Sequence, residues 1–218
     1  MAYTILITAL VLGAASAQEG NRNFGIIEGH IASHADSMAE ACVSIKAANG
    51  AWGSGVIVSE SGMIFSAAHV YRNIGEKVTV FLTRGRRAVA EVVRYDIGHD
   101  IAVLELLNEY QLTAAKVVGS RGIENGKTLV AAGHASGFNA ERRSPLRVGF
   151  GFLAQSKGMI YTTCRITAGD SGGPLYDEAG VLRGVHHTMD GKGKFSSHVP
   201  VQRFFQLWPE LAQTVATV

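Results

Sequence analysis

Short apolar and alternating runs of residues, separated by turn residues, recur along most of the chain. Runs of about four to eight residues with this pattern predict β-strands rather than long helices. The first six predicted strands are Cys42–Ala47, Gly55–Val58, Met63–Ala67, Val78–Leu82, Val89–Arg94 and Ile101–Leu106. The second six are Thr128–Ala132, Leu146–Phe152, Met159–Arg165, Pro174–Tyr176, Val181–Thr188 and Phe195–Val199. The pattern predicts an all-β chain with two successive sets of six strands.

Two segments differ from this pattern. Residues 108–125 are irregular and rich in polar residues, and we expect them to connect the two sets of strands. From residue 200 onward, apolar positions at helical spacing predict a C-terminal helix that caps the fold; they are Val201, Phe204, Phe205 and Trp208, followed by a break at Pro209. We therefore expect an N-terminal barrel over residues 26–118 and a C-terminal barrel with its helix over residues 119–218, together forming one unit.

The composition agrees with a folded, strand-rich chain. Of the 218 residues, 47% are hydrophobic and 17% are charged, which suffices for a sizeable core and excludes a disordered chain. The 26 glycines exceed the usual share and indicate many turns. The net charge of +2 gives no basic surface of the kind that nucleic acids or anionic membranes require, so we expect neither as a partner.

The N-terminal segment predicts export. Residues 2–17 are apolar and uncharged, and they are shorter than the about 20 residues of a membrane span. The small residues Ala15-Ser16-Ala17 fit a signal-peptide cleavage site, so we interpret residues 1–17 as a signal peptide. The product would be secreted or periplasmic, with no stable membrane association once the signal is removed. Because the segment has no Lys or Arg, an uncleaved anchor or a buried strand remains an alternative.

Two cysteines, Cys42 and Cys164, leave the disulfide status open. An exported protein could keep a disulfide between them, but two buried thiols fit the sequence equally well. Neither cysteine has a second ligand at zinc-binding spacing, and the adjacent His186 and His187 would face opposite sides of a strand. We therefore expect no metal and no cofactor.

The segment Gly169–Leu175, GDSGGPL, is the most informative stretch of the chain. A serine hydroxyl becomes a useful nucleophile when a base takes its proton and hydrogen-bond donors receive the developing oxyanion. The glycines around Ser171 allow a tight turn in which the Gly169 and Ser171 N–H groups point at one spot. The segment therefore predicts a nucleophile, Ser171, beside an oxyanion hole.

Two further segments supply partners for such a serine. Ser66-Ala67-Ala68-His69 surrounds a histidine with small residues, which would leave its imidazole at a crevice. Asp100 precedes the apolar strand Ile101–Leu106, where a buried carboxylate can fix the tautomer of a neighbouring imidazole. Asp96 is a rival acid, but no apolar strand follows it directly.

The three blocks GDSGGPL, SAAH and DIAVLEL resemble those of chymotrypsin/trypsin-fold serine peptidases, and they occur in that family's order of His, Asp and Ser. The resemblance implies two six-stranded β-barrels, a triad of His69, Asp100 and Ser171, and an oxyanion hole of the Gly169 and Ser171 amides. It implies no cofactor and a polypeptide substrate. The chain ends soon after the second barrel, so we expect no PDZ-type domain of the HtrA kind, and we expect a monomer.

The segment IIEGHIA from Ile26 is similar to the mature N-terminus of trypsin-like enzymes. That similarity implies an activation peptide over residues 18–25 and a pair between the freed Ile26 amine and Asp170, because a buried carboxylate needs a charged partner. Glu28 and Gly25 depart from the family pattern. The alternative is that residues 18–41 form an N-terminal arm and that no new terminus is needed.

The family alignment also suggests which residues line the substrate pocket. Arg165 would lie at the base of the S1 pocket, where tryptic enzymes carry an acid, so cleavage after Arg or Lys is not expected. His186 matches a pocket histidine of glutamate-specific relatives, and Thr167 and His198 could assist it. A positive or polar pocket would favour an acidic P1 residue through charge-assisted hydrogen bonds. A small or apolar P1 residue remains the alternative.

These observations together predict a secreted serine endopeptidase that acts through an acyl-enzyme. A catalytically inactive homologue that uses the fold for binding is the alternative, but such proteins usually lose a triad residue or the glycines of the oxyanion hole. An esterase of the Gly-x-Ser-x-Gly type would order its triad in reverse.

Overall fold

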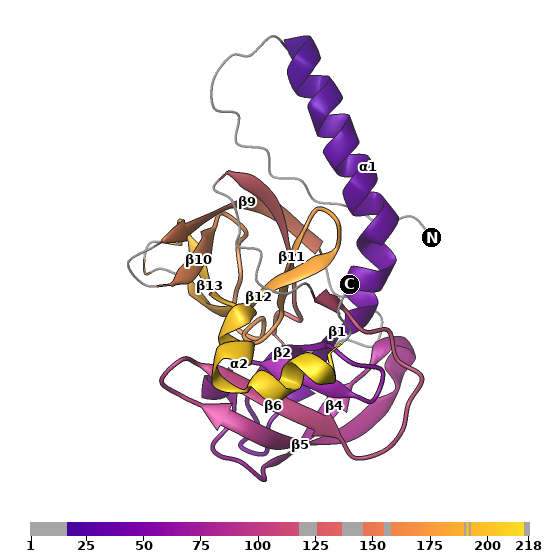
Figure 1. The fold of residues 1–218 in the computed structure, drawn as a ribbon, viewed down its shortest axis with the longest axis vertical. Coiled ribbons are helices and arrows are strands. Elements are labelled where there is room, and N and C mark those ends of the chain that lie inside the picture. Colours follow the sequence, from indigo (N-terminus) through magenta and orange to yellow (C-terminus); the bar gives the residue numbers. More distant parts are fainter. Residues whose placement is uncertain are drawn as a thin grey trace.

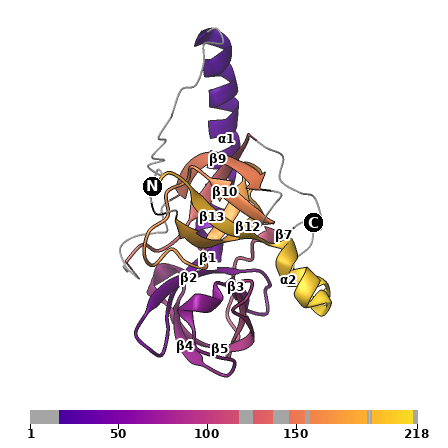
Figure 2. The same ribbon diagram turned by 90° about the vertical axis from the view of Figure 1, so that its left-hand side faces the viewer.

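The computed structural model describes residues 17–117, 126–136, 146–154, 158–189, 191 and 193–215. Two sheets of antiparallel strands pack against each other, and a long N-terminal helix projects from one of them (Figure 1, Figure 2). The chain forms the first sheet, crosses to the second, and ends in a short helix beside the junction of the two. The predicted all-β architecture with a C-terminal helix is confirmed. The predicted signal peptide lies outside the described residues, except for its last residue, Ala17.

The first sheet is a closed barrel of six strands, as the sequence predicts. Its strands, in spatial order, are β1 (Cys42–Lys46), β2 (Trp52–Ile57), β3 (Met63–Ser66), β6 (Ile101–Leu106), β5 (Arg87–Asp96) and β4 (Lys77–Phe81). The inward positions are β-branched and aliphatic side chains that are fully buried, including Ile45, Ile64, Val80 and Leu104. Two 3-10 turns, η1 (Ala68–Val70) and η2 (Thr83–Gly85), follow β3 and β4.

The second sheet contains the six predicted strands and one more. In spatial order the six are β11 (Pro174–Asp177), β8 (Lys127–Ala132), β9 (Leu146–Ala154), β10 (Met159–Thr162), β13 (Ser196–Pro200) and β12 (Val181–Met189). The first and the last of these, β11 and β12, also pair with each other. The extra strand, β7 (Lys116–Val117), pairs in parallel with β12. It lies inside the segment expected to be a plain connector. A strand of two residues is too short to produce a recognisable alternation, so no pattern in the sequence predicts it.

A long helix, α1 (Ala17–Ala41), occupies the segment before the first barrel. The expected activation peptide, residues 18–25, lies within this helix, and residues 26–41 form no barrel strand. Its C-terminal half packs on the core through Ile31, Ala35, Met38 and Ala39, which recur at helical spacing and are all buried. The rest of α1 extends beyond the barrels (Figure 1). None of the helices in the described part of the chain is both long and apolar enough to cross a membrane.

The predicted C-terminal helix consists of α2 (Gln202–Leu207) and a 3-10 turn, η3 (Pro209–Gln213). The α-helix ends just before Pro209, because proline cannot continue the helical hydrogen bonding. Phe204 of α2 is fully buried and stacks on Phe65 of β3 with ring centroids 4.1 Å apart. The helix that follows the second sheet therefore packs against the first barrel and fastens the two together.

Candidate active site

The residues predicted to carry chemistry meet at the junction of the two sheets. His69 belongs to η1 and Asp100 precedes β6, so both come from the first barrel. Ser171 lies on the loop before β11 in the second sheet. His69, Asp100 and Ser171 line one pocket of about 570 Å³.

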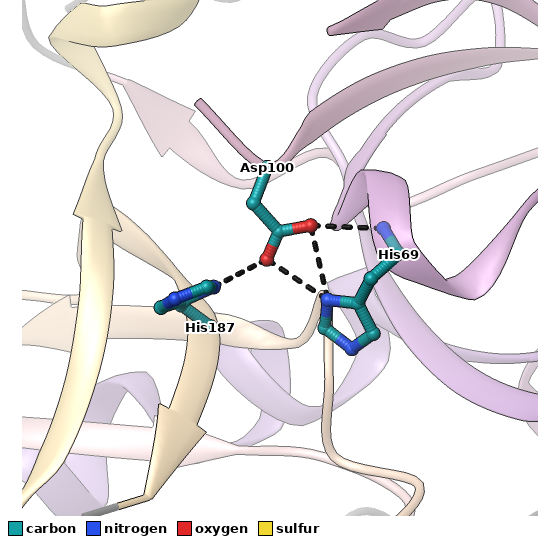
Figure 3. Close-up of side chains that lie close together, drawn as sticks. All are labelled: His69, Asp100 and His187. Carbon is teal, nitrogen blue, oxygen red and sulfur yellow. Dashed lines mark hydrogen bonds and ion pairs between the residues drawn. The ribbon is translucent and has the colours of Figure 1, made fainter. Parts of the chain in front are cut away.

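His69 is held by two hydrogen bonds to the same carboxylate. Its backbone N–H donates to Asp100 Oδ1 at 2.8 Å, and its ring Nδ1 lies 3.0 Å from Oδ1 and 2.9 Å from Oδ2 (Figure 3). Ala67 and Ala68 beside it are fully buried, whereas the His69 side chain is 42% exposed. The small neighbours let the turn pack closely while the imidazole reaches the pocket. The hydrogen bond to Asp100 raises the pKa of His69, outweighing the opposite effect of burial.

Asp100 has a backbone conformation that few residues adopt. Its φ of +56° lies in the left-handed region, which costs free energy for a residue with a side chain. This turn directs the carboxylate at His69, and the side chain is only 8% exposed. Burial alone would raise the pKa of Asp100, but hydrogen bonds from His187 and His69 lower it to about 2. The carboxylate is therefore ionised at neutral pH, which favours a proton on the Nδ1 atom that faces it.

The rival acid, Asp96, holds a different histidine. Its Oδ1 accepts hydrogen bonds from the His99 backbone N–H at 2.7 Å and lies 2.9 Å from His99 Nδ1. Both side chains are partly exposed, at 32% and 41%. Of the two aspartates, Asp100 is thus the one that contacts His69.

The loop that carries Ser171 is fastened to the first barrel by one residue, Ser54 of β2. The Ser54 backbone N–H donates to the Ser171 carbonyl at 2.7 Å, and its hydroxyl donates to the Gly169 carbonyl at 2.8 Å. The same hydroxyl accepts from the His134 N–H at 2.9 Å. Ser54 is fully buried, so these bonds form away from water and fix the loop against the barrel that holds His69.

Gly172 shows why the loop needs glycine. Its φ is +85°, and a Cβ there would meet Ser66 Oγ and the Ser54 carbonyl at less than a normal contact distance. Any side chain at this position would push the loop away from the first barrel.

The backbone at Gly169, predicted to belong to the oxyanion hole, is oriented by one hydrogen bond. Gly169 has a φ of +95°, and the Ala168 carbonyl accepts a hydrogen bond from Ser136 N–H at 2.8 Å. Because a trans peptide places C=O and N–H on opposite sides, this bond turns the Gly169 N–H away from Ser136. Within the described ranges, neither the Gly169 nor the Ser171 N–H donates a hydrogen bond, and none joins the Ser171 hydroxyl to His69.

Asp170 is fully buried and pairs with Arg147 of β9. The guanidinium donates through both terminal nitrogens to the carboxylate, at 2.6 and 3.0 Å, and the Thr167 N–H adds a third bond at 2.8 Å. The expected pair between the Ile26 amine and Asp170 is not formed here, because Ile26 lies within α1 and Arg147 supplies the positive charge. Sequence reasoning missed Arg147, since an arginine on a strand gives no sign of its partner.

The pocket wall is more apolar than the positive or polar wall that an acidic P1 residue would need. Besides His69, Asp100 and Ser171, the wall consists of Ile97, Ile166, Thr167, Ala168, His187, Thr188 and Met189. Thr167 is therefore the one predicted S1 residue that lines this pocket. Arg165 is exposed and outside the lining; it lies beyond the end of β10 at Thr162.

His186 and His198, also expected in S1, are fully buried behind the pocket. Their Nδ1 atoms are 2.9 Å apart, His186 Nε2 donates to the Ala132 carbonyl at 3.0 Å, and the Thr162 hydroxyl lies 2.8 Å from His198 Nε2. Since a carbonyl only accepts, His186 Nδ1 accepts from His198 Nδ1–H, and His198 Nε2 accepts from Thr162. Burial lowers the pKa of His186 to about 3 and that of His198 well below its usual range. Both rings are thus neutral at pH 7 and supply no positive charge to a substrate.

A residue that sequence reasoning passed over, His187, touches the site directly. Its Nδ1 lies 2.5 Å from Asp100 Oδ2, and its ring is 36% exposed in the pocket wall (Figure 3). The signal was present in the sequence: because neighbours on a strand face opposite ways, a buried His186 places His187 on the pocket side of β12.

The two cysteines are separate buried thiols in this structure. The Cys164 Sγ lies near the carbonyls of Leu129 and Arg147, at 3.6 and 3.5 Å, and burial raises the pKa of this thiol to about 11. The open question of a disulfide between Cys42 and Cys164 is thereby resolved for this structure, and neither thiol belongs to the pocket.

Comparison with known proteins agrees with the fold and the pocket. The chain is 32% identical over 141 residues to the "Probable serine protease do-like" of Buchnera aphidicola, covering 62% of this chain and 29% of the relative. It is 31% identical over 146 residues to the "Periplasmic pH-dependent serine endoprotease DegQ" of Escherichia coli, covering 65% and 32%. The human "Serine protease HTRA4" is 29% identical over 167 residues, covering 72% and 34%. The chain thus spans about a third of the length of these curated relatives.

A solved structure and a family model extend this comparison. The crystal structure of the serine endoprotease from Yersinia pestis superposes with a TM-score of 0.72 at 22% identity, covering 86% of this chain and 66% of the other. At that identity the match bears on the fold alone. The family model described as "Trypsin-like peptidase domain" matches residues 53–185, which is more than half of the chain and contains His69, Asp100 and Ser171. The chain therefore belongs to the trypsin-like peptidase domain family.

Proposed function

We propose that the chain is a serine endopeptidase in which Ser171 is the nucleophile and His69 the general base. The observation that carries this proposal is the pairing of His69 Nδ1 with the ionised Asp100 in a pocket that Ser171 also lines. With its proton on Nδ1, the imidazole keeps a lone pair on Nε2, which can take the proton of the serine hydroxyl.

The reaction divides into two steps. In the first, the Ser171 oxygen attacks the scissile carbonyl as His69 takes its proton, and His69 then gives that proton to the leaving amine, which produces an acyl-enzyme. In the second, a water molecule loses a proton to His69 and hydrolyses the acyl-enzyme. The direct bond between Ser171 and His69 forms when substrate arrives, because such bonds are often long in the empty enzyme.

The Gly169 and Ser171 N–H groups would stabilise the tetrahedral intermediate. Both are without an internal acceptor among the described residues. The Ser136 N–H bonded to the Ala168 carbonyl, and the Gly173 N–H bonded to the Asp170 carbonyl, fix the two peptides that carry them. Donors that are fixed before the reaction stabilise the oxyanion without reorganisation, and losing one typically costs about 100-fold to 1000-fold in kcat.

A fluorophosphonate probe tests this proposal, since it reacts only with a serine that a base activates. We expect the wild-type chain to label and Ser171→Ala to remain unlabelled, while the exposed Ser61→Ala variant labels like wild type. Peptide cleavage should follow the labelling. If wild-type chain neither labels nor cleaves, the alternative of a binding protein that has kept the triad residues replaces the proposal.

We infer that the S1 pocket takes a small or apolar P1 residue. Ile166, Ala168 and Met189 contribute apolar surface, and Thr167 and Thr188 contribute neutral hydroxyl groups. The residues expected to hold an acidic side chain are not in this lining: Arg165 lies outside it, and His186 and His198 are neutral and lie behind it. The two imidazoles that do line the pocket, His69 and His187, both contact Asp100. Cleavage of a peptide library should therefore favour residues such as Ala, Val or Leu at P1, and dominant cleavage after Glu would refute this inference.

We infer further that activity needs no new terminus at Ile26. The charge that a free Ile26 amine would bring to Asp170 comes from Arg147, so the buried carboxylate already has a charged partner. N-terminal sequencing of active protein tests this point. Activity that requires cleavage before Ile26 would overturn it.

Export and substrate class complete the proposal. The relatives named above include a periplasmic endoprotease, and residues 2–17 have the composition of a signal peptide. We propose that the chain acts on polypeptides outside the cytoplasm, as a monomer without nucleic-acid or membrane partners. Fusion of residues 1–25 to a reporter that is active only after export would test the location, and gel filtration would test the monomer.

A further inference from the structure

Two imidazoles from different barrels share the carboxylate of Asp100. His69 Nδ1 lies 2.9 Å and His187 Nδ1 2.5 Å from the same oxygen, Oδ2. One ligand atom from each of the three residues lies within 4.8 Å of the other two. Figure 3 shows His69 approaching Asp100 from η1 and His187 approaching it from β12, on the opposite side of the carboxylate.

This set of donors fits a zinc ion. Zinc prefers imidazole nitrogen and carboxylate oxygen at about 2.0–2.2 Å, and open sites commonly use three protein ligands with water in the fourth position. Tetrahedral geometry at those lengths separates ligand atoms by about 3.3 Å, so each nitrogen needs to move away from Asp100 Oδ2 by less than about 1 Å, starting from the 2.9 and 2.5 Å seen here. The ligand atoms of the two histidines lie within 4.8 Å of each other and would approach by up to about 1.5 Å. Both rings are partly exposed in the pocket wall, which gives the ion a path from solvent.

We propose that His69, Asp100 and His187 form a binding site for Zn²⁺, and that the bound ion inhibits the chain. Each neutral imidazole moves its proton from Nδ1 to Nε2 when Nδ1 coordinates the metal, so atoms and charge balance without an added reagent. With its proton on Nε2, His69 can no longer accept the proton of Ser171. Only the inhibition rests on the proposed function, whereas the binding does not require catalysis.

Calorimetric titration of ZnCl₂ into the metal-free Ser171→Ala chain tests the binding directly. We expect one ion per chain and an affinity that falls about tenfold or more in the Ser171→Ala chain that also carries His187→Asn. Mg²⁺ should not bind, because it prefers a shell of oxygen ligands. His30 and His34 lie four residues apart on α1 and offer a two-ligand alternative, so all chains also carry His30→Gln.

The matched control is His99→Asn. His99 is also a partly exposed histidine whose ring contacts an aspartate, Asp96. Asp96, however, contacts one imidazole, whereas Asp100 contacts two. We expect this variant to bind Zn²⁺ with unchanged affinity. Equal affinity in the His187→Asn and His99→Asn chains, or no saturable binding to the parent chain, would overturn the proposal.

A measurement on the chain with no substitution at His187 covers the case in which His187→Asn does not fold. In ¹⁵N-detected imidazole spectra of the Ser171→Ala chain, one equivalent of Zn²⁺ should shift the His69 and His187 signals and leave His99 in place. A shift confined to other histidines would refute the site. In the active chain, Zn²⁺ should slow fluorophosphonate labelling and a chelator should restore it. Zinc binding without such slowing would refute the inhibition alone, and failure of labelling in metal-free chain would instead refute the proposed function.

Discussion

The pair of Arg147 and Asp170 makes a quantitative prediction about stability. Arg147→Met keeps an unbranched apolar stem and removes the charge, so that among the hydrogen bonds described above only those from Thr167 to the buried carboxylate remain. Breaking a buried pair in this way typically costs about 3–5 kcal/mol. Because Arg147 is 20% exposed and Thr167 still donates to Asp170, we expect the lower end, about 3 kcal/mol.

The assay is urea unfolding in a Ser171→Ala background, which excludes autolysis. Arg94→Met is the matched control, because its pair with Glu210 has a similar N–O distance of 2.9 Å but is 33% and 55% exposed, so we expect a loss of at most about 1 kcal/mol. Adding Asp170→Asn to Arg147→Met should recover part of the lost free energy of unfolding, because a neutral amide is less costly to bury than an unpaired charge.

The same substitution should affect catalysis, since Asp170 lies between the two amides of the proposed oxyanion hole. In the active chain, Arg147→Met should lower kcat more than it raises KM, because it disturbs a group needed chiefly in the transition state. Equal stability losses in Arg147→Met and Arg94→Met, or no recovery in the double variant, would refute the reasoning.

Three further predictions follow from the same geometry. The rate kcat/KM should fall at acidic pH with a midpoint above 6.5, because the bond to Asp100 raises the pKa of His69, and a midpoint below 6.5 would contradict this. As the pH falls from 6.5 to about 4, the free energy of unfolding should decrease, because the unfolded chain gains protons at His186 and His198 that the folded chain excludes. If His186→Gln leaves this dependence of the free energy of unfolding on pH unchanged, the prediction is contradicted. Ser54→Ala should lower the free energy of unfolding by about 1–3 kcal/mol and also lower kcat, because it removes the two hydrogen bonds of a buried hydroxyl. Ser44→Ala should cost less, because the Ser44 hydroxyl is buried without a hydrogen-bond partner among the described residues. Equal losses of unfolding free energy in the two variants would contradict this prediction.

The sign of the acid effect depends on all the groups that titrate in that range. The folded pKa of His186 lies below its unfolded value, so its contribution is complete above pH 6.5 and is lost as the pH falls towards about 3. His69 acts in the opposite direction, because its raised pKa favours the folded state at acidic pH. Asp100 begins to lose its contribution only below its unfolded value of 3.8. Burial also lowers the pKa of His134, so this histidine adds to the effect of His186. Above pH 4 the decrease therefore belongs to the three histidines whose pKa burial lowers, His134, His186 and His198.

The strands could be predicted from the sequence because their signal is local. Each barrel strand buries alternate side chains, so the pattern repeats within a few residues and needs no knowledge of distant contacts. The α1 helix escaped prediction because three of the five buried side chains that the structure describes in it, over residues 27–41, are alanines; the other two are Ile31 and Met38, and Ile27 is partly buried. Alanine contributes little to an apolar stripe although it favours helix strongly.

The residues of the candidate site likewise differ in whether a local sequence motif marks them. Ser171, His69 and Asp100 stand in segments whose neighbours restrict the backbone, so each leaves a recognisable motif. Arg147 and His187 act through partners 23 and 87 residues away, Asp170 and Asp100 respectively. No neighbouring residue marks Arg147, and the neighbour His186 indicates only which side of β12 His187 faces, not its partner. Such pairings depend on the docking of strands, which sequence patterns do not record.

The site is therefore a property of the junction between the two barrels rather than of either barrel. Asp100 accepts hydrogen bonds from His69 of the first barrel and His187 of the second, and Ser54 reaches from the first barrel to the loop of Ser171. Phe204 stacks on Phe65 across the same junction. Because a displacement of about 1 Å is enough to misalign reacting groups, a change that loosens this junction should abolish the alignment of the triad while each barrel keeps its own core. Loss of activity should then precede loss of β-structure as the chain is heated.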